Sequence, residues 1–149
     1  MSLAKLLQQQ QRRLGGIIEL LERERTLLAD ADLDGKALAD IAERKQELLS
    51  RVEASETLRQ GVQRRLGYAD GAAGAQQAAV DAGCGQAWRQ TLELTREAQR
   101  LNALNGKLVS LRMEQNTSLL DMIHRVAEKT TYHSSGRVAA QSGRIDASV

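Results

Sequence analysis

The sequence predicts an all-α fold: an elongated antiparallel helical bundle or coiled-coil hairpin of three main helices, with a flexible C-terminal tail. The 149 residues include no Pro, no Phe, one Trp and two Tyr, so aromatic residues that favour strands are scarce. Ala, Leu, Gln, Glu and Arg, which favour helices, dominate instead. Apolar residues also recur at helical spacing through most of the chain.

The first helix is expected at about residues 3–29, because its apolar positions alternate four and three residues apart, as in a heptad seam. Asp30, Asp32 and Asp34 then interrupt the pattern. Since an Asp side chain accepts hydrogen bonds from the free amides of a helix start, a new helix should begin near Asp32 or Asp34. The seam consists of Leu3, Leu7, Leu14, Ile17, Leu21 and Leu28, with Gln10 and Glu24 in its gaps.

The second helix is expected at residues 34–66 and should end at Gly67, a residue type common just after helices. Lys45 and Ser55 occupy core positions of its apolar pattern. Because the junction is short, the first two helices can be either collinear or folded back on each other.

A Gly- and Ala-rich linker is expected at residues 67–85, GYADGAAGAQQAAVDAGCG, which is too small-sided to bury much surface. Its alanines could form a helical turn or two. The third helix should span residues 86–130, with Trp88 covering one end of the bundle. These helices form a predicted domain at 1–130, followed by a flexible tail at 131–149.

The third helix carries two apolar rows, whereas a single seam against one partner helix needs only one. Such a helix requires more than one neighbour, from its own chain or from another protein. The first row is Leu101, Leu104, Leu108, Leu111, Leu119, Met122 and Val126. The second row is Val109, Met113, Leu120, Ile123 and Ala127, accompanied by Asn102, Asn105 and Asn116.

Composition and spacing argue against several classes of function. A net charge of +2, spread through alternating signs, provides no basic stripe for nucleic acid. Apolar runs are too short for membrane insertion, and a cytoplasmic protein is expected. His124 and His133 lack the spacing of a helical metal site, and no catalytic constellation or phosphate loop is present, so we expect no enzyme, metal or cofactor.

Two motifs resemble the FlgN family of flagellar type III export chaperones. The family shares an L-N-x-x-N-G-x-L helix core, which matches residues 101–108, and a downstream Tyr-Gly-x-x-Gly-Arg segment, which matches residues 132–137. The second motif departs from the family pattern at His133 and Ser135.

The resemblance implies a chaperone that binds the C-terminal helical regions of hook–filament junction proteins and prevents their premature assembly. It also implies delivery to the cytoplasmic domain of the membrane protein that forms the flagellar export gate. The apolar groove of such a chaperone would receive an amphipathic client helix. The candidate client-binding residues are Asn102, Leu104, Asn105, Gly106, Leu108, Val109, Met113, Asn116, Leu120 and Ile123.

Several alternatives remain open at this stage. Gly106 either permits close backbone approach or is a weak point on an exposed face. Tyr132, with Gly136 and Arg137, either engages the export gate or belongs to a tail that is disordered or covers the apolar helix. A self-associating structural coiled-coil protein without a client is the main competing function, because heptads serve both purposes.

Overall fold

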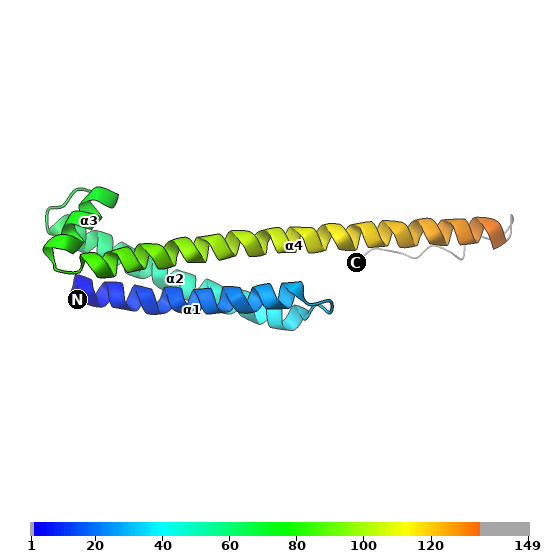
Figure 1. Ribbon diagram of the computed structural model, residues 1–149, viewed down its shortest axis with the longest axis horizontal. Helices are drawn as coiled ribbons and strands as arrows, with labels where there is room; N and C mark the ends of the chain where they lie inside the picture. Colours follow the sequence, from blue (N-terminus) through cyan, green and yellow to red (C-terminus); the bar gives the residue numbers. More distant parts are fainter. Residues whose placement is uncertain (1, 135–149) are drawn as a thin grey trace. The chain divides into compact units, whose positions relative to one another are not determined.

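The computed structural model describes residues 2–134, with side-chain environments for residues 2–129. All regular secondary structure in these residues is α-helical, which confirms the predicted fold class (Figure 1). The chain divides into two units, Met1–Gly106 and Lys107–Val149. The helices are α1 (Leu3–Ala29), α2 (Gly35–Arg65), α3 (Ala72–Asp81) and α4 (Gly85–Ser134).

In the first unit, α1 and α2 fold back on each other as an antiparallel hairpin (Figure 1). Gln10, near the start of α1, donates to the Glu56 carboxylate late in α2 (3.1 Å). Glu24, near the end of α1, pairs with Lys45 in the first half of α2 (2.9 Å). The short acidic junction therefore forms a reversal, which answers the question that the sequence left open.

The ends of the hairpin helices follow the signals in the sequence. The Asp34 carboxylate accepts a hydrogen bond from the Ala37 amide (3.0 Å), so Asp34, one of the two predicted positions, is the N-cap of α2. At the other end of α2, Gly67 has a φ of 86°, a left-handed conformation that costs glycine little. The predicted stop at Gly67 is confirmed.

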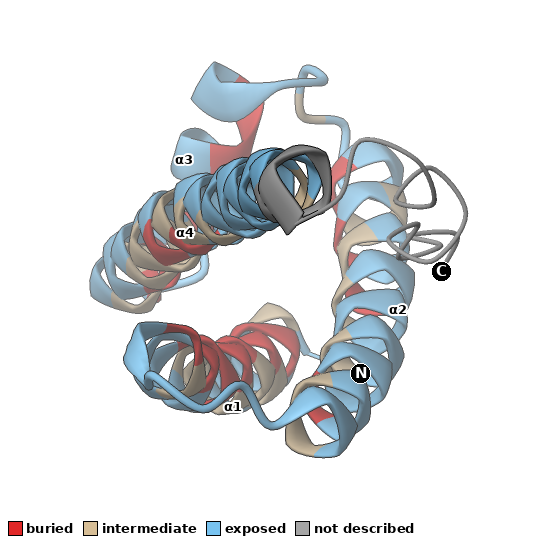
Figure 2. Cartoon of the chain, turned by 90° about the vertical axis from the view of Figure 1, so that its right-hand side faces the viewer, coloured by how far each residue is buried: buried red, intermediate tan, exposed pale blue. Residues whose placement is uncertain are grey.

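The first-unit part of α4 runs parallel to α1. The Gln11 side chain donates to the Ala87 carbonyl (2.9 Å) and to the Thr91 hydroxyl (3.2 Å). Further along, Leu101 is buried against Ile17 and Leu21 of α1. Figure 2 shows that the buried positions of α1, α2 and α4 gather on the sides that these helices turn toward each other.

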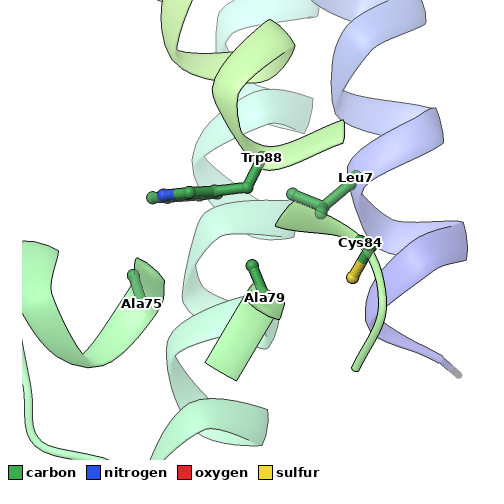
Figure 3. Packing of buried hydrophobic residues seen from close by; sticks show 5 residues of the cluster. All are labelled: Leu7, Ala75, Ala79, Cys84 and Trp88. Carbon is green, nitrogen blue, oxygen red and sulfur yellow. The ribbon is translucent and has the colours of Figure 1, made fainter. Parts of the chain in front are cut away.

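The expectation that the 67–85 linker buries little surface is wrong, because ten of its residues form α3. Ala75 and Ala79 of this helix are buried against Leu7, Cys84 and Trp88 (Figure 3). Alanine keeps helix propensity high while its single methyl lets the backbone approach closely, so a small-sided helix still packs. Trp88 covers the end of the bundle, as predicted.

A buried guanidinium joins α2 to this end of the bundle. Arg59 is 6% exposed, and its guanidinium carbon lies 4.7 Å from the centroid of the Trp88 ring. It donates to Glu56 (2.6 Å) and to Gln63 (2.8 Å). Burial works to raise the pKa of the Glu56 carboxyl, but hydrogen bonds from Arg59 and Gln10 outweigh it and hold that pKa below its usual value.

Helix α4 ends at Ser134, beyond the expected end at Thr130. Tyr132 therefore belongs to the helix rather than to a turn, which corrects the expected start of the tail at residue 131. The residues from Thr130 to Ser134 include neither Gly nor Pro, so nothing in them opposes continuation of the helix. Within residues 2–134, no helix has both the length and the apolar character needed to cross a membrane.

Gly74 of α3 provides a test of how tightly this helix packs. A methyl group there would overlap the Ala69 carbonyl and crowd the Gln63 amide. We expect Gly74→Ala to lower the free energy of unfolding by about 1–3 kcal/mol, the usual cost of overpacking. Gly15→Ala is the matched control, because a methyl at Gly15 meets no atom within 4 Å. It should stabilise α1 by about 0.5–1 kcal/mol. Urea unfolding of both variants measures this, and shifts of the same sign would contradict it.

Candidate functional site

The second unit carries a row of exposed apolar side chains on α4. Val109 is 41% exposed, Met113 64%, Leu120 49% and Ile123 42%. Their spacing of three, four or seven residues places them along one side of the helix. We call Val109, Met113, Leu120 and Ile123 the client row, since all four are among the predicted client-binding residues.

The other predicted apolar row is equally exposed in this unit. Leu111, Leu119, Met122 and Val126 each expose more than half of their surface. Across residues 107–129, the described side chains include none that is buried. Scattered apolar residues are normal on a protein surface, whereas contiguous apolar stretches are typical of interaction surfaces.

In the first unit, Asn105 of the helix motif at residues 101–108 packs inward against α1. Asn105 is 1% exposed, and its Nδ2 donates to the Leu21 carbonyl (2.8 Å) and to the Glu24 carboxylate (2.9 Å). The second oxygen of that carboxylate pairs with the Lys45 ammonium (2.9 Å). One carboxylate thus links α1, α2 and α4. We call Glu24, Lys45 and Asn105 the carboxylate junction.

The remaining client-binding candidates on α4 occupy different environments. Asn102 and Asn116 are exposed, and Leu104 and Leu108 are half-buried. Gly106 is exposed, and a methyl group there would meet no atom of the chain within 4 Å. No packing within the described chain therefore requires glycine at this position.

Of the three tail candidates, Tyr132 is the one within the described residues. Tyr132 lies in α4, where its backbone is helical. Gly136 and Arg137 fall outside the described residues, and the engagement of the export gate by these three residues stays a prediction. Among the described residues, no cluster of three His, Cys, Asp or Glu side chains is arranged to hold a metal ion.

A groove in the first unit was not predicted from the sequence. It encloses about 530 Å³ between α1, α2 and α4. Leu14, Ile17 and Leu21 of α1 line it. Its walls are Ala42, Lys45, Gln46, Leu49 and Val52 of α2, and Thr95, Ala98, Gln99 and Asn102 of α4.

The carboxylate junction was also missed, although a signal for it exists. Glu24 fills a gap in the apolar seam of the first helix, and Lys45 occupies a core position of the second. Opposite charges at core positions of two consecutive helices are costly to bury singly and therefore indicate a buried pair. The antiparallel hairpin brings these two residues together.

Comparison with known proteins decides the family. The family model described as FlgN protein matches residues 1–140. The chain belongs to the FlgN family. FlgN proteins are a chaperone family and not an enzyme family, so a flagellar export chaperone role is the coarse function of this chain.

A curated FlgN relative agrees with this assignment. The chain is 24% identical over 137 residues to the flagella synthesis protein FlgN of Escherichia coli (strain K12). The alignment covers 92% of this chain and 90% of the relative, so the similarity extends over nearly the whole of both FlgN sequences. No solved structure matches the chain significantly.

Two asparagines of the FlgN motif should differ in their effect on stability. Asn105→Ala removes the buried amide that bonds to Glu24 and Leu21, and it should lower the free energy of unfolding by about 1–3 kcal/mol. Asn102→Ala changes an exposed side chain and should stay within about 0.5 kcal/mol of the wild type. Chemical denaturation followed by circular dichroism measures both, and equal losses would contradict the assigned roles.

Proposed function

We propose that this chaperone binds the C-terminal helical regions of hook–filament junction proteins along the client row, in the cytoplasm. The observation that carries the proposal is the exposure of Val109, Met113, Leu120 and Ile123 on one side of α4. Amphipathic helices are commonly recognised by laying their apolar side against such a surface. Occupation of the client row would keep the client helix from assembling prematurely.

The energetics of this surface favour a helical client. Burying a Val, Leu, Ile or Met side chain contributes about 1.5–3 kcal/mol, so the four residues of the client row offer a substantial driving force. Leu108, which is half-buried, lies one residue before Val109 and adds to the apolar contact. The exposed amides of Asn102 and Asn116 are available to fix the register of the client by hydrogen bonding.

Two of the sequence candidates have other roles in this proposal. The Asn105 amide nitrogen is engaged in the carboxylate junction, so we assign that side chain to the position of α4 rather than to the client. Gly106 has no side chain, so a client backbone can approach α4 closely at this position. No atom of the chain itself occupies that space.

Delivery to the export gate is the second half of the proposal. We assign delivery to the segment around Tyr132, Gly136 and Arg137, because these residues match the Tyr-Gly-x-x-Gly-Arg motif of the family. A gate contact separate from the client row would let the chaperone hold its client while it docks.

A test of the client row introduces a negative charge at exposed apolar positions of α4. Val109→Asp and Ile123→Asp should each weaken binding to a purified hook–filament junction protein at least tenfold, because a charge replaces an apolar contact. Helicity should not change, since both positions are exposed. Ser118→Asp, an exposed polar position on another side of the helix, is the control. Isothermal titration calorimetry measures the affinities.

Two outcomes would contradict the client-row assignment. Unfolding of the two variants would mean that the row is internal core. A stable dimer in light scattering that ignores the junction protein would favour the self-associating coiled-coil alternative, because the same exposed rows could pack against a second copy.

A gate test uses the ring of Tyr132. Tyr132→Ala should lower binding to the purified cytoplasmic domain of the export-gate protein, because it removes the apolar and aromatic contact area. Binding to the junction protein should be unchanged. Tyr132→Phe, which keeps the ring, separates the role of the ring from that of the hydroxyl. Equal gate binding by wild type and Tyr132→Ala in a pull-down titration would rule out this residue as the gate contact.

A further inference from the structure

We infer that the second unit of the chain binds two helices of one client, the first on the client row and the second on a row of leucines beside it. This inference rests on the proposed function, which supplies the client. The second site consists of Leu108, Leu111, Leu119 and Met122, which we call the leucine row. Leu108 is half-buried, and the other three residues expose more than half of their surface.

The two rows together are too wide for one partner helix. The apolar arc runs from Leu111 through Leu108 and Val109 to Met113, which is about 200° of the helix circumference at about 100° per residue. A helix that packs against one neighbour needs an apolar stripe only about 100° wide. A client helix laid on the client row therefore leaves the leucine row exposed to water.

The two rows also repeat at different intervals. In the client row, Met113 and Leu120 are seven residues apart. In the leucine row, Leu108 and Leu119 are eleven residues apart, and the other two members of the row have the same separation. A seven-residue period favours a left-handed supercoil, whereas an eleven-residue period favours a right-handed one. Because one partner helix coils around α4 in one direction, each row needs a helix of its own.

The border of the leucine row selects the partner by charge. Lys107, Arg125 and Lys129 are exposed along the side of this row that is turned away from the client row. Glu114 lies near this border but leaves it positive. A client helix with acidic side chains beside its apolar seam would be attracted to the border.

The same border disfavours a second copy of the chaperone on the leucine row. In an antiparallel pair of copies, the two basic borders would face each other, and like charges repel. In a parallel pair, the basic border of each copy would lie beside the client row of the other and would compete with the client. The charges therefore favour the client over a second copy.

A single client chain can supply both helices. Once one segment of the client lies on the client row, a neighbouring segment of the same chain is held at a high effective concentration beside the leucine row. Two helices on adjacent sides of α4 would also contact each other, so that three helices bury both rows. This arrangement covers the apolar sides of two client helices at once, which strengthens the block on premature assembly.

Charge substitutions on the leucine row test the inference in the full-length chain. Leu111 and Met122 lie on the edge of this row that is farthest from the client row. Leu111→Asp and Met122→Asp should each weaken binding of a purified junction protein about tenfold, because a carboxylate would enter the contact with the second helix. Ser110→Asp, exposed on the polar side of α4, is the control and should bind as the wild type does. Wild-type affinity of both leucine-row variants would overturn the inference.

Photo-crosslinking keeps the inference testable if a charge on the leucine row disturbs folding. Benzophenone side chains at Leu111 and at Met113 should crosslink to two different helical segments of one junction protein, identified by mass spectrometry. Crosslinks from both positions to the same segment would mean that one helix binds, and no crosslink from Leu111 would mean that the leucine row is empty. A crosslinked chaperone dimer from Leu111 would identify a second copy as the occupant. Each of these three results would overturn the inference.

The two proposals fail in distinguishable ways. If the wild-type chain binds no junction protein, the proposed function fails. If Val109→Asp weakens binding while Leu111→Asp and Met122→Asp bind as the wild type does, the client row stands and only the second helix site fails.

Discussion

The Glu24 carboxylate is the interaction on which the first unit depends. A carboxylate in this largely buried place is costly unless it is paired and hydrogen-bonded, and the penalty amounts to several kcal/mol per ion. Lys45 supplies the opposite charge from α2, and Asn105 supplies an amide from α4. Apolar seams tolerate sliding of one helix along another, whereas these directional bonds are satisfied in one register. The charge that costs stability in isolation therefore specifies how the three helices align.

The hydrophobic core of the first unit lies between two bridging contacts. At one of them, the Glu24 carboxylate pairs with Lys45 and accepts a hydrogen bond from Asn105. At the other, the Arg59 guanidinium lies over the Trp88 ring. Between these contacts, Ile17, Leu21 and Leu101 form a buried cluster, against which Leu48, Val52 and Ala98 pack. The first unit thus buries its apolar side chains among three helices, while the second unit exposes apolar side chains on a single helix.

Local signals account for most of what the sequence predicted correctly. The heptad spacing, Asp34 and Gly67 located α1 and α2 because capping and periodicity act within a few residues. Helix α3 was underestimated because the burial of Ala75 and Ala79 depends on Trp88 from another segment. Asn102 and Asn105 lie only about 60° apart around α4. Asn102 is exposed, whereas Asn105 is buried with 1% of its surface exposed. This difference depends on the neighbouring helices rather than on the motif.

The packing of Trp88 gives the protein a natural optical reporter. It is the one tryptophan of the sequence, it is 8% exposed, and it lies in the first unit beside the Arg59 guanidinium. Its emission therefore senses the local polarity and solvent access of the α3 end of the bundle. Far-ultraviolet circular dichroism, in contrast, sums the helical residues of both units. The two signals together can assign a melting step to the bundle or to the remainder of α4 without any label.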